Sequence, residues 1–356
     1  MSDIRMITKR YKALLDERLR HFFRERLKRS EHISPTAREM MEHMMEFSLR
    51  GGKRLRPILV IFGYKAVGGK KEKEILQAAI AVELMESFLL VHDDIMDQDE
   101  MRRGYLTMHR IYENKCHRYS KDLDGARYGE SMAMLAGDIL SIMGSEVLLK
   151  TRFPVKRKLE AVDCFNRAVI NTCFGQAIDV KMALSRQVKE KEIQRLYELK
   201  TAVYTIEAPL HIGAILAGAK KRELSAMSGY AIPLGQAFQI QDDILGIYGT
   251  RQKIGKPVGS DIIEGKKTLL IAKAMEHASP SELKFLKKQL GNKRLSSRQL
   301  DKVKKIISGT GALDMCKQQA TSLADEAKDS ISKVKLTDEG KSFLYGLADY
   351  VVKREY

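Results

Sequence analysis

Apolar side chains recur three and four residues apart through most of the chain. This helical period runs through eleven segments: 36–50, 74–98, 128–150, 157–184, 190–218, 223–248, 266–278, 281–290, 297–306, 311–333 and 337–354. The breaks between them carry Gly or Pro, at Gly51–Gly52, Gly68–Gly69, Pro154, Gly218, 249–259, Pro280 and Gly309. We find no strand alternation, no hairpin signal and no dividing linker. The sequence therefore predicts an all-α fold, one helical bundle over residues 1–356.

The remaining segments modify this picture little. Residues 111–127 are polar and predict a surface excursion. The first twenty residues are charged and helical in pattern, so we expect no signal peptide. No uninterrupted apolar run reaches the roughly 18 residues that a membrane span needs. The four cysteines, far apart and without CxxC spacing, predict reduced core thiols. We therefore expect a soluble cytoplasmic protein without a membrane span.

The formal charge of +17 indicates a possible anionic partner, and nucleic acid, an acidic membrane surface and small polyanions are the candidates. The basic residues are spread along the chain, and no zinc-finger spacing, stacking motif or basic zipper accompanies them. We interpret most of the charge as solvated surface, with a few cations binding something specific, and expect no nucleic-acid partner.

A first acidic cluster ends the apolar segment 74–98. Asp93 and Asp97 lie one helical turn apart and share a face, with Asp94 beside them. Like charges this close favour a cation, and hard oxygen ligands suit magnesium. Arg102 and Arg103 follow, as a diphosphate would need. Alone, the cluster could equally be an acidic, solvated helix end.

A second cluster, Asp242 and Asp243, follows the apolar segment 223–248. The loop GKPVGSD then supplies Lys256 and Asp261, and EGKKT supplies Lys266. This too could be a polar helix end. Two acidic clusters on separate helices, each followed by basic residues, instead suggest a two-sided clamp in which magnesium links the helices to a diphosphate.

With nine short motifs in the family's order, the chain resembles the trans-isoprenyl diphosphate synthases over nearly its whole length, and most closely the archaeal short-chain geranylgeranyl diphosphate synthases. They are GGKRLRP at 51–57, HDDIMD at 92–97, MRRG at 101–104, LAGD at 135–138, GQAID at 175–179, KTA at 200–202, FQIQDD at 238–243, GKPVGSD at 255–261 and EGKKT at 264–268. The resemblance implies the isoprenoid synthase type of helical bundle with a central cavity, and a homodimer.

The resemblance also implies a role for each matching residue. Asp93 and Asp97 would bind two of about three magnesium ions with Asp94 in support, and Asp242, beside Asp243, would hold the third. The remaining roles concern the substrates, isopentenyl diphosphate and the allylic dimethylallyl, geranyl and farnesyl diphosphates. The allylic diphosphate would be bound by Arg102, Lys200 and Lys256, with Lys266 nearby. Isopentenyl diphosphate would be bound by Lys53, Arg56 and Arg103. The positions beside the reacting carbons would be those of Thr201, Phe238 and Gln239, and the cavity would be lined by Gln176 and Asp179.

Two positions depart from the family pattern. Gly246 stands where many relatives carry a third Asp of the second cluster. Glu86 stands where the resemblance places a His or Gln that contacts isopentenyl diphosphate, so it is a substrate-site residue of the wrong charge. It could pair with a neighbouring Lys or Arg, be protonated, or weaken substrate binding enough to mark a poor catalyst.

Product length in this family depends on bulky residues four and five positions before the first Asp. Here these are Leu89 and Phe88, with Met85 a turn deeper. One aromatic residue at the fifth position resembles geranylgeranyl diphosphate synthases, although Phe88 could simply pack against a neighbouring helix. Alternatives are a farnesyl or bifunctional C15/C20 synthase, a terpene cyclase or head-to-head coupling enzyme, and a non-catalytic subunit of a heteromeric synthase. The isopentenyl-site residues argue against the cyclase.

Overall fold

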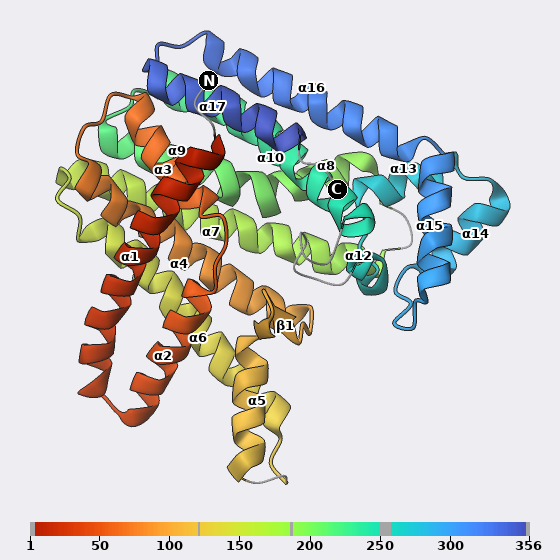
Figure 1. The fold of residues 1–356 in the computed structure, drawn as a ribbon, viewed down its shortest axis with the longest axis horizontal. Coiled ribbons are helices and arrows are strands. Elements are labelled where there is room, and N and C mark those ends of the chain that lie inside the picture. Colours follow the sequence, from red (N-terminus) through yellow and green to blue (C-terminus); the bar gives the residue numbers. More distant parts are fainter. Residues whose placement is uncertain (1–3, 120–121, 186–187, 250–257, 354–356) are drawn as a thin grey trace. The chain divides into compact units, whose positions relative to one another are not determined.

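The computed structural model describes residues 4–119, 122–185, 188–249 and 258–353. The all-α prediction is confirmed, since most of these residues lie in helices (Figure 1). The chain divides into two compact units, which we call the N-terminal unit (2–166 and 211–218) and the C-terminal unit (167–210 and 219–356). The single domain over residues 1–356 stays a prediction, with one cooperative unfolding transition as its expected signature.

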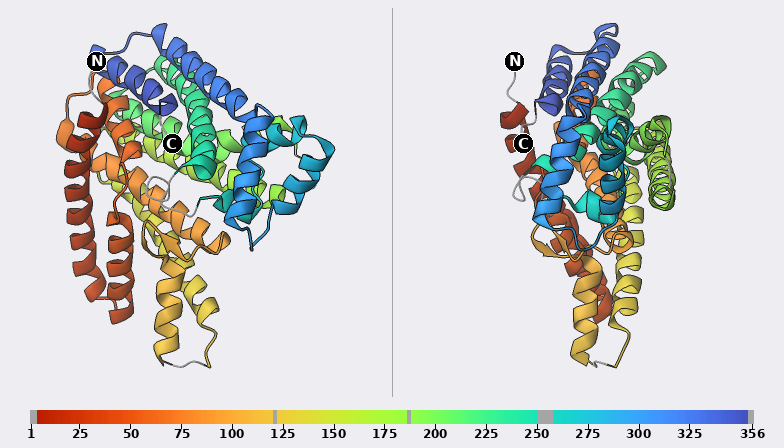
Figure 2. Two further views of the ribbon diagram at one scale, coloured as in Figure 1. Left: turned by 45° about the vertical axis from the view of Figure 1, so that its right-hand side comes forward. Right: turned by 90° about the vertical axis from the view of Figure 1, so that its right-hand side faces the viewer.

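The N-terminal unit is built around α4, whose residues are mostly buried. α4 packs on α3 and α6, α5 packs on α6, and α1 lies beside α2 (Figure 2). Ser34 caps α2 by accepting from the Ala37 amide, and Asp124 caps α6 in the same way from Arg127. The elements are α1 (Ile4–Glu31), α2 (Pro35–Leu49), α3 (Leu55–Ala66), α4 (Glu72–Met96), β1 (Met101–Arg102), β2 (Tyr105–Leu106), α5 (Met108–Tyr119), α6 (Gly125–Leu149) and the start of α7 (Val155–Leu184).

The C-terminal unit is built around α10, which packs on α16 and on a π-helix, η1. α16 lies alongside α10 in both views of Figure 2. Thr268, Ser279, Ser296 and Thr337 cap four of its helices through their hydroxyl groups. The elements are α8 (Glu190–Tyr197), η1 (Glu198–Glu207), α9 (Ala208–Ala217, shared with the N-terminal unit), α10 (Lys221–Tyr248), α12 (Ser260–Glu264), α13 (Leu269–His277), α14 (Pro280–Gln289), α15 (Ser297–Gly309), α16 (Ala312–Ser332) and α17 (Asp338–Val352).

Several sequence expectations need correction. Residues 101–106 form a two-stranded hairpin, Met101–Arg102 with Tyr105–Leu106, although the sequence shows no hairpin signal. The turn residues Arg103 and Gly104 both have positive φ, 53° and 84°, as a tight two-residue hairpin requires. The segment 111–127, predicted as a surface excursion, includes most of α5 and the beginning of α6. Among the cysteines, Cys173 is exposed, whereas Cys116, Cys164 and Cys316 are buried as expected.

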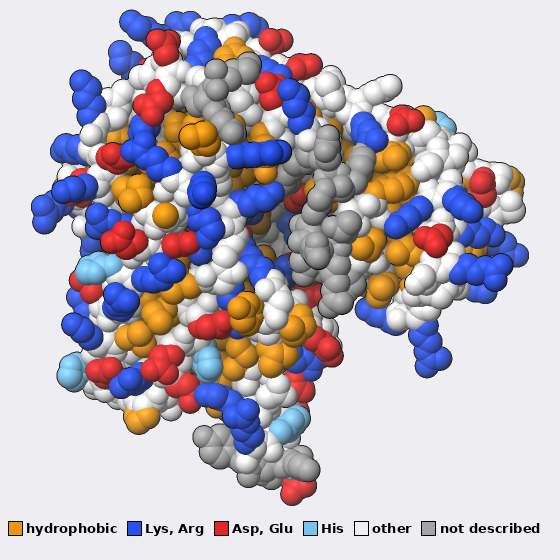
Figure 3. Space-filling view, viewed as in Figure 1, with side chains coloured by type: hydrophobic (Ala, Val, Ile, Leu, Met, Phe, Trp, Pro, Cys, Tyr) orange, Lys and Arg blue, Asp and Glu red, His pale blue; other side chains and the backbone are white. Residues whose placement is uncertain are grey.

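Among the described residues, two helices, α4 and α6, are long and apolar enough to cross a membrane by length and composition. Each contains an 18-residue window with a mean hydropathy of 1.6. The window of α4 is 78% buried, as in the core helix of a soluble protein, and that of α6 is 44% buried. The lack of a membrane span therefore stays a prediction. The search for uninterrupted apolar runs in the sequence missed these two helices because polar residues interrupt them. Figure 3 shows Lys and Arg interspersed with Asp and Glu over the visible face.

Candidate active site

The first acidic cluster closes α4 in the N-terminal unit. Asp93 and Asp97 are partly exposed, whereas Asp94 points inward and its side chain is fully buried. The Asp97 amide, at the helix C-cap, donates to the Asp93 carbonyl. The cluster thus presents two carboxylates one turn apart and keeps a third inside the fold.

Arg102, from the hairpin, holds this inner carboxylate. Its Nε donates to Asp94 Oδ1 at 2.7 Å, Nη2 contacts the same oxygen, and Asp99 Oδ2 lies 3.2 Å from Nη2. Burial raises the pKa of Asp94 to about 6, assisted by Asp99 and Asp93 and opposed by Arg102. The predicted contact of Arg102 with an allylic diphosphate stays a prediction, and the structure adds a second task, anchoring the cluster.

The residues expected to bind isopentenyl diphosphate come from the α2–α3 connection and the hairpin. Lys53 is exposed, and Arg56 and Arg103 are partly buried. Glu86 on α4 lies between the two guanidinium groups, with Oε2 3.0 Å from Arg56 Nη1 and Oε1 3.1 Å from Arg103 Nη2. Of the alternatives that the sequence leaves open for Glu86, the structure has the one in which it pairs with neighbouring arginines.

The second acidic cluster lies near the end of α10 in the C-terminal unit. Asp242 is partly exposed and Asp243 is buried. Gln239 Nε2 donates to Asp243 Oδ1 at 2.8 Å, and the Tyr197 hydroxyl donates to Oδ2. Burial raises the pKa of Asp243 well above its ordinary value, and Asp261 and Asp242 raise it further. The assignment of Asp243 as a metal ligand stays a prediction, with both of its oxygens already accepting hydrogen bonds.

The π-helix η1 carries Lys200 and Thr201, and π-helical turns are frequent at functional sites. Lys200 Nζ pairs with Asp179 Oδ2 at 2.5 Å, and Thr201 Oγ1 donates to Gln239 Oε1 at 2.7 Å. Two glycines allow neighbouring helices to approach this segment. A Cβ on Gly175 would lie 2.6 Å from the Lys200 nitrogen, and one on Gly235 would lie 2.3 Å from the Ala202 Cβ.

A cavity of about 180 Å³ collects most predicted residues of the C-terminal unit. It is lined by Asp179, Leu196, Tyr197, Lys200, Thr201, Gln239, Asp242, Asp243, Gly246, Ser260, Asp261, Lys266, Lys267 and Thr268. At Gly246, an added Cβ would lie 2.7 Å from Asp261 Oδ2, so the carboxylate of Asp261 occupies the space beside the position where many relatives carry Asp. Lys256 lies outside the described residues.

Several residues that line this cavity are not among the predicted site residues, and Tyr197 and Asp261 stand out among them because of their polar contacts. Tyr197 joins Asp243 to the α13 N-terminus, because its oxygen also accepts from the Leu269 amide at 2.8 Å. No local pattern marks Tyr197 as a site residue. For Asp261 the signal was its place in GKPVGSD, next to the predicted Lys256.

The residues expected to limit product length lie on α4. Phe88 and Met85 are buried and Leu89 is partly exposed. The Phe88 ring packs edge-on against the His92 ring, with 5.0 Å between centroids. His92 Nε2 in turn lies 3.1 Å from the Met134 carbonyl of α6. Phe88 therefore has a packing partner in addition to any contact with a growing chain.

The donor set fits magnesium. Asp93 and Asp97 are partly exposed carboxylates on one helix face, and magnesium is commonly held by one or two carboxylates together with substrate phosphates. Within the described ranges, no group of three or more His, Cys, Asp or Glu side chains converges to hold an ion.

Comparisons with known proteins agree with this arrangement. The family model described as polyprenyl synthetase matches residues 37–308. A geranylgeranyl diphosphate synthase of Sulfolobus acidocaldarius is 36% identical over 91% of this chain and 93% of its own. A geranylfarnesyl diphosphate synthase of Aeropyrum pernix is 35% identical over 85% of this chain and 91% of its own.

A solved structure agrees as well. A geranylgeranyl pyrophosphate synthase of Corynebacterium glutamicum, complexed with isoprenyl diphosphate and magnesium, has a TM-score of 0.91 at 29% identity over 97% of this chain and 99% of its own. The chain therefore belongs to the polyprenyl synthetase family. Its activity class is that of a trans-prenyl diphosphate synthase, which the sequence predicts.

Proposed function

We propose that the protein condenses isopentenyl diphosphate with allylic diphosphates, head to tail, and releases geranylgeranyl diphosphate as its main product. Phe88 is the observation that carries the product length: it is buried on α4 five residues before Asp93, with the smaller Leu89 beside it. The relatives named geranylgeranyl diphosphate synthase support the same assignment.

In each cycle the allylic C–O bond breaks and the diphosphate leaves with the electron pair. The double bond of isopentenyl diphosphate then forms a C–C bond with the allylic carbon, and a proton is lost to the departing diphosphate. Lys200, Arg102 and Lys256 would bind that diphosphate and stabilise its growing negative charge. The hydrogen-bonded pair Thr201 and Gln239 would turn oxygen atoms toward the positive carbon, which their place in the cavity lining supports.

Asp93, Asp97 and Asp242 would hold about three magnesium ions, with Asp94 and Asp243 behind them. When bound, magnesium would neutralise the allylic diphosphate and make it a better leaving group. Lys53, Arg56 and Arg103 would orient isopentenyl diphosphate so that its double bond meets the allylic carbon without a search in solution. Lys266, in the cavity lining, would add to the positive charge there.

The experiment uses purified protein, magnesium, labelled isopentenyl diphosphate and, separately, the five-, ten- and fifteen-carbon primers. We expect a metal-dependent twenty-carbon product. Phe88→Ala should lengthen the products and Leu89→Phe should shorten them to fifteen carbons, whereas Leu90→Ala, next along the helix, should leave product length unchanged. A wild-type stop at fifteen carbons would contradict the proposed length, and no elongation from any primer would contradict catalysis.

One observation favours a second candidate product of twenty-five carbons. Relatives named geranylfarnesyl diphosphate synthase are nearly as similar to this chain as those named for the twenty-carbon product. The same assay decides between them, because the two products differ by one five-carbon unit.

We also propose that the protein acts as a cytoplasmic homodimer. α6 exposes Leu135, Ile139, Ile142 and Leu149, which follow one another at helical spacing on one face, and Ile142 is 70% exposed. Such a stripe is costly to leave in water and suits a second copy. Light scattering should give twice the chain mass, and Ile142→Glu should reduce it to the chain mass. A wild-type monomer would contradict the proposal.

A further inference from the structure

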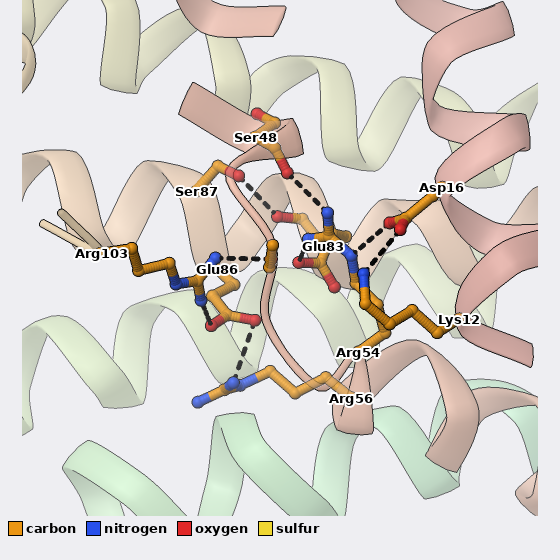
Figure 4. A network of polar contacts seen from close by, with 10 residues as sticks. Lys12, Asp16, Ser48, Arg54, Arg56, Glu83, Glu86, Ser87 and Arg103 are labelled. Atoms are coloured by element: carbon orange, nitrogen blue, oxygen red, sulfur yellow. Dashed lines mark hydrogen bonds and ion pairs between the residues drawn. The ribbon is translucent and has the colours of Figure 1, made fainter. Parts of the chain in front are cut away.

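Glu86 contradicts the electrostatics expected of its position. The family pattern places a neutral or basic residue there, facing the diphosphate of isopentenyl diphosphate. Here a carboxylate lies between Arg56 and Arg103, two of the three cations assigned to that diphosphate (Figure 4). The site therefore contains an anion of its own.

Arg103 is held in place beside this carboxylate by the α2–α3 connection. Arg103 Nη1 also donates to the Gly51 carbonyl at 2.9 Å. A Cβ on Gly52 would lie 3.1 Å from Arg103 Nη1, so the glycine leaves room for the arginine beneath the loop. The Glu86 side chain is 13% exposed and that of Arg56 is 15% exposed, which limits screening by water.

The carboxylate of Glu86 is ionised. Burial raises its pKa, but Arg56, Arg103 and Arg54 together outweigh burial, and the net pKa lies below the ordinary value. Glu86 thus adds a negative charge at the pH at which the reaction would be run.

The neighbouring interior of α4 already contains another carboxylate, Glu83. One turn earlier on α4, the buried Glu83 pairs with Arg54, and Arg54 Nε also donates to Asp16 Oδ1 at 2.7 Å (Figure 4). Arg54 Nη2 donates a hydrogen bond to the Ser48 carbonyl at 3.0 Å. The charge of Glu86 opposes that of Glu83, and Glu86 is stabilised by its ion pairs with Arg56 and Arg103.

We propose that Glu86 is a specificity-determining residue that competes, as a built-in counter-anion, with isopentenyl diphosphate for Arg56 and Arg103. This inference rests on the proposed function, which assigns those arginines to that substrate. An arriving diphosphate has to share the two guanidinium groups with Glu86 and bind beside its charge. The result is weak binding of isopentenyl diphosphate, with the allylic diphosphate unaffected because it is assigned to other cations.

The test compares wild type with Glu86→Gln and Glu86→His, in steady-state kinetics with each substrate varied separately and in calorimetric titration with isopentenyl diphosphate alone. Removing the charge should lower the KM and Kd for isopentenyl diphosphate roughly tenfold or more. The KM for the allylic substrate should stay within about twofold. Glu86→Asp keeps the charge and should leave the Kd near or above the wild-type value.

Glu326→Gln, an exposed position on α16, removes the same formal charge from the chain and should change neither constant. Circular dichroism and thermal unfolding check that each variant is folded. An unchanged or higher Kd for isopentenyl diphosphate in folded Glu86→Gln would overturn the inference, since Glu86 would then organise the arginines rather than compete for them. If wild type elongates no primer, the proposed function fails, while the titration still decides on Glu86.

Discussion

The buried carboxylates of α4 and α10 are satisfied in different ways. On α4, Asp94 is bound by Arg102 and Glu83 by Arg54, so each inner carboxylate has a cationic partner. On α10, Asp243 has only the uncharged donors Tyr197 and Gln239 among the hydrogen bonds that the structure shows. Both clusters nevertheless repeat one plan, with the first Asp partly exposed and the second turned inward.

The difference has an electrostatic consequence. An arginine favours the ionised carboxylate, so the pKa of Asp94 rises only to about 6 despite burial. Uncharged donors oppose burial less, and the pKa of Asp243 rises well above its ordinary value. The same dipeptide, Asp-Asp near a helix end, therefore has an inner residue paired with a cation in one unit and an inner residue held by uncharged donors in the other.

The largest expected effect concerns the outer residues, where the two clusters should behave alike. Asp93→Asn and Asp242→Asn should each lower kcat/KM by about 10³-fold, because each removes charge that stabilises the transition state. Steady-state kinetics at saturating magnesium measures the loss. Asp301→Asn, an exposed position on α15, is the matched control and should keep full activity. Full activity of either cluster variant would remove that cluster from the mechanism.

The inner residues should differ in stability. Asp94→Asn leaves Arg102 with less counter-charge in a buried place and should lower the free energy of unfolding by about 3 kcal/mol. Asp243→Asn replaces a carboxyl among uncharged donors and should cost about 1 kcal/mol. Urea unfolding of the metal-free proteins gives both values. Equal losses would show that the charged partner makes no difference.

A pH-dependent effect should appear on the α4 side. Burial, and then the charge of Glu86, raise the pKa of Glu83 from 4.5 to about 7 against the pull of Arg54. Above pH 4.5 the unfolded chain releases this proton while the folded chain retains it, so this contribution to stability is lost as pH rises from about 4.5 to 7. The difference in unfolding free energy between Glu83→Gln and wild type should shift by roughly 2 to 3 kcal/mol in favour of the variant.

Measuring both proteins at pH 5 and pH 7.5 cancels the titration of groups far from Glu83, because it is common to both. What remains is the titration of Glu83 together with its effect on the neighbouring Glu86. A difference that does not change with pH would mean that Glu83 is ionised over the whole range, with Arg54 prevailing over burial.

The smallest effect concerns the uncharged network of the C-terminal unit. Thr201→Val removes the hydroxyl that donates to Gln239 and should lower the free energy of unfolding by about 1 kcal/mol. Thr201→Ser retains the donor and should recover most of that loss. Denaturant unfolding compares the three proteins, and identical stabilities would show that this hydrogen bond contributes nothing to the network.

Most of the helical framework could be predicted from the sequence. The segments 36–50, 74–98, 128–150 and 223–248 match α2, α4, α6 and α10 to within a few residues. The period is legible because each helix hides one face, and that face repeats along the backbone. α3 escaped because LRPILVIFGYKA is apolar almost throughout and buried on most sides, which removes the period. α5 escaped because its sequence is largely polar.

The candidate site likewise has features that are visible in the sequence and features that only the tertiary structure shows. The one-turn spacing of Asp93 and Asp97 and the basic residues after each cluster are local features, so a metal-assisted diphosphate chemistry could be predicted there from the sequence, and it stays a prediction. That Tyr197 reaches Asp243, that Asp261 fills the space beside Gly246 and that Glu86 bridges Arg56 and Arg103 was decided by the tertiary structure. These partners are separated by fifteen or more residues. Helical periodicity follows from backbone geometry within a few residues, whereas the meeting of distant side chains depends on the path of the whole chain.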